Sequence, residues 1–171
     1  MNEREGIITM KGNPLTLLGP ELKVGEAAPD FEVTANDLSP VSLSEFKGKV
    51  CVITTVPSLD TSVCDTMTRT FNEKATQPGD DVVVLAVSMD LPFAQKRWCG
   101  AANVENVHTL SDHKEASFGR AYGVLIKELR LLSRAVFVVD REGIIRYIEM
   151  VGELTNEPDY EAALNVVKGL V

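Results

Sequence analysis

Short runs of apolar, mostly β-branched residues alternate along the chain with segments of helical periodicity. Three of these runs are nearly unbroken, at residues 50–56, 82–87 and 135–139. Such runs are typical of central strands that are buried on both faces. Pro57 ends the first run, because proline cannot donate to the ladder of a central strand. A turn at residues 140–143 then leads into residues 144–148, which we expect to form an antiparallel partner.

Two pairs of shorter strands are expected before these runs. The first pair is a hairpin around a Gly-Asn-Pro turn, and the second is joined through Asn36 and Asp37. The expected strands are residues 7–10 with 15–18 and residues 31–34 with 41–43. We interpret residues 1–171 as one domain, in which residues 1–24 form an N-terminal hairpin extension.

Four helices are expected between and after the strands, at residues 63–75, 92–101, 112–122 and 158–167. The inward face of the first is predicted from residues spaced four apart, namely Val63, Met67, Phe71 and Ala75. A Gln-Pro-Gly sequence at residues 77–79 should end this helix, and Gly123 stands where the third needs a C-terminal cap. Strands that alternate with helices predict an α/β protein with a thioredoxin-like fold, a central mixed β-sheet flanked by helices.

Composition and charge narrow the class of protein. A chain of 171 residues, 44% of them hydrophobic, can bury a full core without disulfides or metals. The net charge of −8 argues against nucleic-acid binding. No apolar run approaches the roughly 20 residues of a membrane span, and the acidic N-terminus does not resemble a secretory signal. We therefore expect a cytoplasmic protein without a membrane partner, whose cysteines have chemical rather than structural roles.

Cys64 is the first candidate for such a role. It lies in or near the first turn of a helix, where free backbone N–H groups and the helix dipole stabilise a thiolate, the nucleophilic form. A fast reaction with a peroxide would also need fixed donors that stabilise O–O cleavage. Thr61 can supply a hydroxyl beside the sulfur, and Arg134, at the mouth of an apolar strand, can supply a guanidinium.

Each of these residues also has a purely structural interpretation, which the pattern leaves open. Cys64 could be a small buried hydrophobe, and Thr61 could be a helix N-cap. Arg134 could be a strand-end arginine that pairs with a local carboxylate. Cys51 lies inside a buried strand, and we expect it to be inert core packing.

No metal or cofactor is expected. His108 and His113 are too sparse and too badly spaced for a metal site, and no Cys-x-x-Cys pair is present to bind zinc. Asp60 and Asp65 are interpreted as acids of a helix N-terminus rather than as an acid/base pair.

The sequence around Cys64 resembles the active-site motif of the peroxiredoxins. Pro57, Thr61 and Cys64 match the pattern Pro-x-x-x-Thr-x-x-Cys, and the fuller stretch from Val56 to Cys64 is similar to the bacterial thiol peroxidase subfamily. Further similarity lies at residues 25–31, 97–99, 133–136 and 157–160, and in the N-terminal hairpin. The resemblance therefore covers essentially the whole chain.

This resemblance implies a role for each candidate residue. Cys64 would be the peroxidatic cysteine, Thr61 and Arg134 would complete the peroxide-binding site, and Pro57 would shield the sulfur. Cys99 would be the resolving cysteine of an atypical two-cysteine mechanism, with a disulfide within one chain. The resemblance also implies an antioxidant enzyme that reduces hydrogen peroxide and alkyl hydroperoxides, forms a homodimer and is recycled by thioredoxin.

The rival hypothesis is a thiol–disulfide exchange protein or redox-sensing module on the same fold. Exchange proteins of this fold usually carry Cys-x-x-Cys at the start of the helix, and this chain does not. Cys64 and Cys99 belong to different expected helices, and a disulfide needs Cα atoms within roughly 7 Å. We therefore expect the reduced protein to hold the sulfur atoms apart, so that one or both helices must unwind before the cysteines can bond.

Overall fold

The computed structural model of the chain describes residues 2–74, 81–102 and 107–171. The helices are α1 (Ser62–Lys74), α2 (Pro92–Ala102), α3 (Ser117–Ala121) and α4 (Tyr160–Leu170), with a 3₁₀ turn η1 (Leu43–Phe46). The strands are β1 (Glu3–Met10), β2 (Asn13–Leu18), β3 (Glu32–Thr34), β4 (Pro40–Ser42), β5 (Val50–Thr55), β6 (Val82–Ser88), β7 (Val107–Ser111), β8 (Leu125–Ile126), β9 (Ala135–Val139) and β10 (Ile145–Met150).

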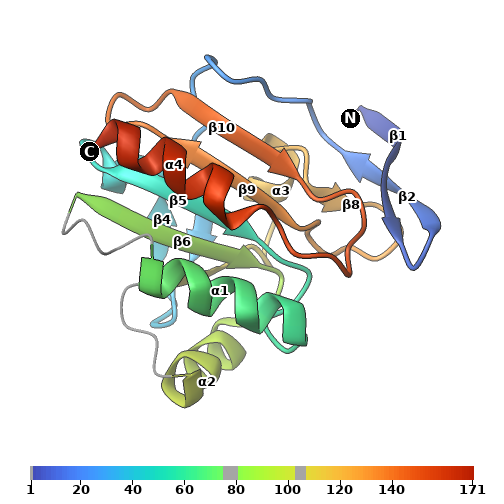
Figure 1. Cartoon of the computed structure of the whole chain (residues 1–171). Coiled ribbons are helices and arrows are strands. Elements are labelled where there is room, and N and C mark those ends of the chain that lie inside the picture. The colour runs from blue at the N-terminus through green and yellow to red at the C-terminus, as the bar shows by residue number, and fades with distance from the viewer. Residues whose placement is uncertain (1, 75–80, 103–106) are drawn as a thin grey trace.

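A seven-stranded sheet forms the centre of the molecule, in the order β10-β9-β5-β6-β7-β3-β4. The pairs β5·β6 and β6·β7 are parallel, whereas β9 is antiparallel to both β5 and β10. Helices α1 and α4 cover one face, α3 lies on the other, and α2 lies beside α1 (Figure 1). The predicted thioredoxin-like α/β fold with a mixed sheet is confirmed.

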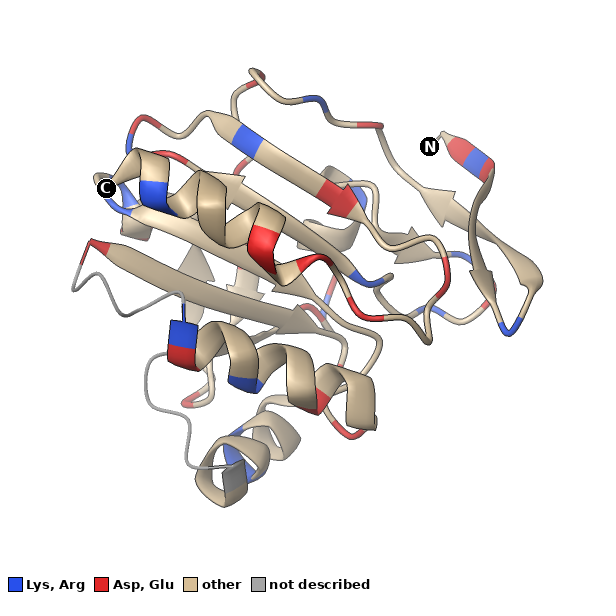
Figure 2. Ribbon diagram, viewed as in Figure 1, with Lys and Arg blue, Asp and Glu red and all other residues tan. Residues whose placement is uncertain are grey.

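The three apolar runs form the three central strands. Every residue of β5, β6 and β9 is buried and none is charged, and their ribbons are tan along almost their whole length in Figure 2. Side chains from alternate positions point to opposite faces and join two separate core clusters. Burial on both faces explains why the runs show no alternation of apolar and polar residues.

The N-terminal hairpin forms as predicted, with β1 antiparallel to β2. It does not join the central sheet, because β2 pairs instead with β8 to give a three-stranded sheet. Thr9 fastens the hairpin to the loop after β10, where its N–H donates to the Gly152 carbonyl at 2.7 Å and its carbonyl accepts from Leu154 at 2.9 Å. The Glu153 carboxylate in this loop also accepts from the Gly12 N–H at 3.0 Å and from the Thr9 hydroxyl at 2.9 Å.

The helix predicted at residues 112–122 is wrong in its first half, because α3 spans only Ser117–Ala121. The buried Asp112 carboxylate accepts from the N–H groups of Phe118, at 3.0 Å, and Gly119, at 2.8 Å. Asp112 thus caps the first turn of α3 without being part of the helix. Ala116, which lies between Asp112 and the helix, has a left-handed φ of 53°. Gly123, at φ 67°, does follow the helix end as predicted.

Two further details differ from the predicted pattern. Val63 is half-buried, and the inward face of α1 is formed by Cys64, Met67, Thr68 and Phe71. Ala75 and the expected helix stop at residues 77–79 lie outside the described residues. Strands β7 and β8 were not predicted, because β7 contains polar residues and β8 has two residues only.

No helix in the described ranges is long and apolar enough to span a membrane.

The link between the hairpin and the loop after β10 should depend on pH through Glu153. Hydrogen bonds from the backbone of Gly12 and from Thr155 lower the pKa of this carboxyl from 4.5 to about 2. A lowered pKa in the folded state means that the stabilisation is present above pH 4.5 and is lost as the pH falls towards 2. We expect the amide NMR signals of Gly12 and Thr155 to titrate with a midpoint near pH 2, and this titration should vanish in Glu153→Gln. A midpoint near 4.5 would show that the carboxylate is not held by these groups.

Candidate active site

Cys64 lies in the first turn of α1, after a loop that leaves the end of β5. Thr61 immediately precedes the helix, and its hydroxyl accepts from the Cys64 N–H at 3.3 Å and donates to the Ser58 carbonyl at 3.2 Å. This is the geometry of a helix N-cap, so the capping interpretation of Thr61 is confirmed. The hydroxyl therefore fixes the backbone of Cys64, and its hydrogen bonds go to the main chain rather than to the sulfur.

The loop before Thr61 is fixed by Asp90, a residue that the sequence did not single out. Its carboxylate accepts from the Ser58 hydroxyl, the Leu59 N–H and the Ser88 hydroxyl, each at 2.8 Å. Asp90 lies two residues beyond the end of β6. Because β6 is parallel to β5, the two strands end at the same edge of the sheet. The sequence shows only that an acidic residue follows a central strand. It does not show that this residue accepts hydrogen bonds from Ser58 and Leu59, which lie 32 and 31 residues earlier.

Arg134 contacts the sulfur of Cys64. Its Nη1 donates to Sγ at 3.0 Å, while Nε and Nη2 both donate to the Leu154 carbonyl, at 3.0 and 2.9 Å. The contact follows from strand pairing: Thr55 ends β5 opposite Ala135, which begins β9. Arg134 is therefore placed next to the loop that leads from β5 into α1. The sequence-based candidates Cys64 and Arg134 are 70 residues apart and meet at one point.

The charge of Arg134 is buried, which restricts what its neighbours can be. Its side chain is 2% exposed and Cys64 is fully buried. No Asp or Glu within residues 2–74, 81–102 and 107–171 forms an ion pair with Arg134, so the strand-end pair with a local carboxylate is not observed. A buried cation is costly unless an anion lies beside it. A thiolate at Cys64 supplies that anion, so this arrangement can hold the sulfur in its nucleophilic form.

Cys99 lies on α2 and is half-buried. Its sulfur is 3.2 Å from the Thr109 hydroxyl, which donates its single hydrogen to the Asn36 side-chain oxygen at 3.1 Å. With its hydrogen directed at Asn36, the Thr109 oxygen is left to accept from the Cys99 thiol. Cys64 and Cys99 are both free and have different partners. Nothing in the sequence pointed to Thr109 and Asn36.

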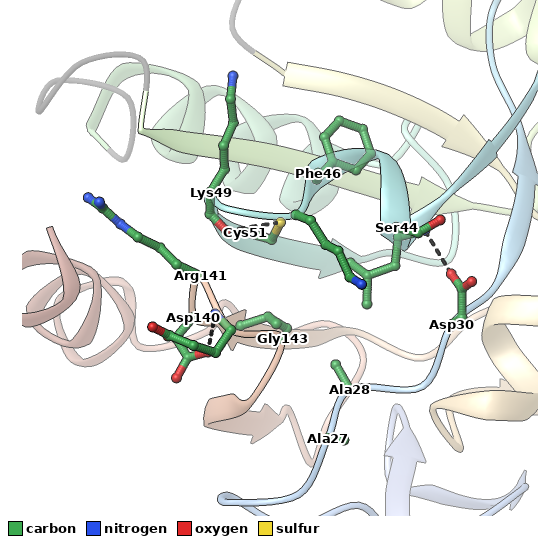
Figure 3. A pocket seen from close by; sticks show the side chains of 14 residues that line it. Ala27, Ala28, Asp30, Ser44, Phe46, Lys49, Cys51, Asp140, Arg141 and Gly143 are labelled. Atoms are coloured by element: carbon green, nitrogen blue, oxygen red, sulfur yellow. Dashed lines mark hydrogen bonds between the residues drawn. The ribbon is translucent and has the colours of Figure 1, made fainter.

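Cys51 lies near the other end of β5, at a hollow of about 340 Å³ that Figure 3 shows from close by. The hollow is also lined by Lys49, Asp140 and Arg141, among others. The Cys51 thiol is 3.8 Å from the Lys49 carbonyl, and burial raises its pKa to about 12. A thiol with so high a pKa is almost entirely protonated near neutral pH and is a poor nucleophile. Its packing in the core agrees with the interpretation of Cys51 as inert.

The remaining candidates take structural positions. Pro57 is half-buried directly beyond β5, and Asp65 lies in the first turn of α1, as expected for an N-terminal acid. His108 packs against the ring of Phe46, and its pKa is lowered by burial. In the described part of the chain, no three His, Cys, Asp or Glu side chains gather as they would around a metal ion.

Comparison with known proteins places this chain in a family. Residues 23–164 match the family model described as Redoxin. The chain is 61% identical over 161 residues to a protein of Halalkalibacterium halodurans called thiol peroxidase, covering 94% of this chain and 96% of that protein. A protein of the same name from Bacillus subtilis is 56% identical over 164 residues, covering 96% and 98%.

Solved structures agree with the sequence relatives. A peroxiredoxin-like protein from Aquifex aeolicus superposes with a TM-score of 0.90 at 47% identity, covering 98% of this chain and 99% of that one. A thiol peroxidase from Chromobacterium violaceum gives a TM-score of 0.85 at 20% identity, over 95% of each chain, which bears on the fold alone. With a matching model over most of its length and relatives this similar, the chain belongs to the Redoxin family and is a thiol peroxidase of the peroxiredoxin type.

Proposed function

We propose that Cys64 is the peroxidatic cysteine of this peroxidase and that Arg134 is its partner in catalysis. The observation that carries the proposal is the 3.0 Å contact between a buried guanidinium and a buried sulfur, with no described carboxylate to neutralise the cation. A side chain that needs an anion beside it favours the thiolate over the thiol. Cys64 also lies in the first turn of α1, close to the positive end of the helix dipole.

In the first step, the Cys64 thiolate attacks the distal oxygen of a hydroperoxide. The S–O bond forms as the O–O bond breaks, and the sulfur is oxidised to a sulfenic acid. The departing oxygen takes up a proton and leaves as water from hydrogen peroxide or as an alcohol from an alkyl hydroperoxide. Arg134 stays charged throughout and donates to the oxygen that gains negative charge, which is the kind of fixed donor that lowers such a barrier.

Thr61 and Pro57 are assigned supporting roles in this step. Thr61 is exposed, and its hydroxyl lies within hydrogen-bonding distance of the Cys64 N–H, so it can orient a peroxide that approaches the sulfur. Pro57 is half-buried at the end of β5 and limits access of water to Cys64. Because Cys64 is fully buried, a peroxide reaches the sulfur only when part of its surroundings moves.

Cys99 is the proposed resolving cysteine. Its thiol attacks the sulfenic acid of Cys64, the S–S bond forms, and the hydroxyl leaves as water with the proton of Cys99. Thioredoxin then supplies the two electrons that return both cysteines to thiols. Cys99 is half-buried and contacts Thr109, so its sulfur is freed more easily than that of the fully buried Cys64.

We also propose that the protein acts as a homodimer in the cytoplasm. Three free cysteines suit a reducing compartment. Leu91 and Phe93 are large apolar side chains at the start of α2 that are 55% and 67% exposed, which supports a protein contact near Cys99.

Replacement of the proposed nucleophile, Cys64, should abolish peroxide reduction. In Cys64→Ser, peroxide consumption with excess dithiothreitol should fall to the rate without enzyme, because an alkoxide is not accessible near neutral pH. Cys51→Ala is the matched control and should keep full activity, since at pH 8 a thiol with a pKa of about 12 is ionised in about one molecule in ten thousand. Substantial turnover by Cys64→Ser, or its loss in Cys51→Ala, would contradict the assignment.

Removal of the guanidinium should slow the first step. We expect Arg134→Ala to reduce the second-order rate constant with hydrogen peroxide by about 100- to 1,000-fold, the range for loss of one fixed donor. Far-ultraviolet circular dichroism should confirm that the variant is folded. Arg146→Ala serves as the control, because Arg146 pairs with Asp140 on the sheet edge and should be removable without loss of rate. A folded Arg134→Ala enzyme with the normal rate constant would refute the role of Arg134.

Exchange of the resolving cysteine should separate the two steps. Cys99→Ser should still react once with peroxide and leave a sulfenic acid at Cys64 that dimedone labels. Its turnover with thioredoxin should fall sharply, because no intramolecular disulfide forms for thioredoxin to reduce. If the thioredoxin-dependent rates of Cys99→Ser and the parent protein are equal, another group resolves the sulfenic acid.

A further inference from the structure

A hydrogen bond joins the two helices that carry the proposed catalytic cysteines. The indole Nε1 of Trp98, on α2, donates to the Asp65 carboxylate, on α1, at 3.0 Å. Asp65 is the neighbour of Cys64 and Trp98 is the neighbour of Cys99. The two helices lie beside each other in Figure 1, and Trp98 packs, half-buried, against the cluster that contains Cys64.

The other oxygen of the same carboxylate is also used. Oδ2 of Asp65 accepts from Nε of Arg69 one helical turn later, at 2.9 Å, so the carboxylate is oriented from both sides. The Asp65 side chain is 35% exposed and that of Arg69 46%. Ion pairs so open to solvent contribute little. The hydrogen bond from the half-buried indole of Trp98 is different, because it joins Asp65 on α1 to α2. A hydrogen bond to a charged acceptor is also stronger than one between neutral groups.

Formation of a disulfide places a demand on this bond. Cys64 must leave Arg134 and Cys99 must leave Thr109 before the two sulfur atoms can bond, and the Cα atoms must come within roughly 7 Å. Any unwinding of the first turn of α1 displaces Asp65, and any unwinding at Cys99 displaces Trp98. The bond therefore opposes both motions.

We propose that Asp65 and Trp98 form a latch that holds α1 and α2 in the peroxide-reactive conformation and slows resolution. Both are positioning residues, since neither touches a reacting atom. The proposal rests on the proposed roles of Cys64 and Cys99. While the latch is closed, Cys64 stays beside Arg134. Once Cys64 is oxidised, the latch must open before Cys99 attacks the sulfenic acid and water is released, so the latch sets how long the sulfenic acid survives.

Three variants separate the bond from the charge. Trp98→Phe removes the donor and keeps an aromatic ring. Asp65→Ala removes the acceptor, whereas Asp65→Asn removes the charge but keeps an oxygen that can accept from the indole. Arg69→Gln is the matched control, because it removes the ion pair of Asp65 and leaves the indole bond in place.

Each protein is mixed with one equivalent of hydrogen peroxide, quenched in acid, alkylated and analysed by mass spectrometry for sulfenic acid and disulfide. The first step should stay within about two-fold of the parent in all variants. The second step should be about ten-fold faster in Trp98→Phe and Asp65→Ala, equivalent to about 1.4 kcal/mol. It should stay within about three-fold in Asp65→Asn and Arg69→Gln. An unchanged or slower second step in Trp98→Phe and Asp65→Ala would overturn the latch.

Hydrogen exchange on the reduced protein tests the latch without any catalytic step. Asp65→Ala should raise amide exchange at residues 62–66 and Asp65→Asn should not, and Trp98, the single tryptophan of the chain, should show a matching change of fluorescence in Asp65→Ala. Equal exchange in both variants and the parent protein would refute the latch whatever the role of Cys99. Conversely, full thioredoxin-dependent turnover by Cys99→Ser would refute the proposed role of Cys99 and would leave the exchange test of the contact between Asp65 and Trp98 unaffected.

Discussion

The contact between the guanidinium of Arg134 and the sulfur of Cys64 is the interaction on which the proposed chemistry depends. Both groups are buried, and the described residues offer no carboxylate to neutralise the arginine. A cation in this position stabilises a thiolate, because the anion recovers part of the solvation that the guanidinium lost on burial. In the proposed mechanism, the same donor also faces the oxygen atoms of an attacking peroxide. One electrostatic constraint thus accounts for both the activation of the nucleophile and the stabilisation of O–O cleavage.

Much of the fold serves to hold these two groups together. The antiparallel pairing of β5 with β9 brings Arg134 to the loop that precedes α1, and Asp90 fixes that loop at the end of β6. The carbonyl of Leu154 accepts hydrogen bonds from Nε and Nη2 of Arg134. These two bonds orient the guanidinium so that Nη1 points at the sulfur of Cys64. The backbone of Leu154 is in turn bound to Thr9 of the N-terminal hairpin. The hairpin therefore supports the active site from a distance, although it shares no strand pair with the central sheet.

The sequence predicts most elements of this fold and identifies Cys64 and Arg134 as candidates, which the structure places in contact. The β-branched runs of β5, β6 and β9 are readable because burial on both faces excludes polar residues. Long-range partners are not readable, since a polar side chain such as Asp90 or Thr109 leaves no periodic signal. The helix predicted at residues 112–122 is too long because of another such partner. The Asp112 side chain accepts from the N–H groups of residues six and seven positions later, which the sequence pattern does not reveal. The spacing of residues in the sequence could not decide whether Arg134 contacts a sulfur or a carboxylate. That depends on the pairing of β5 with β9, which brings Arg134 next to Cys64.

The charge state of Cys64 is the most direct test of this account. It can be followed through the ultraviolet absorbance of the thiolate in a Cys51→Ala, Cys99→Ser protein, in which Cys64 is the single remaining thiol. The account predicts a thiolate absorbance in the folded protein that is lost when Arg134 is replaced by Gln. A thiolate absorbance that is the same with and without Arg134 would contradict it.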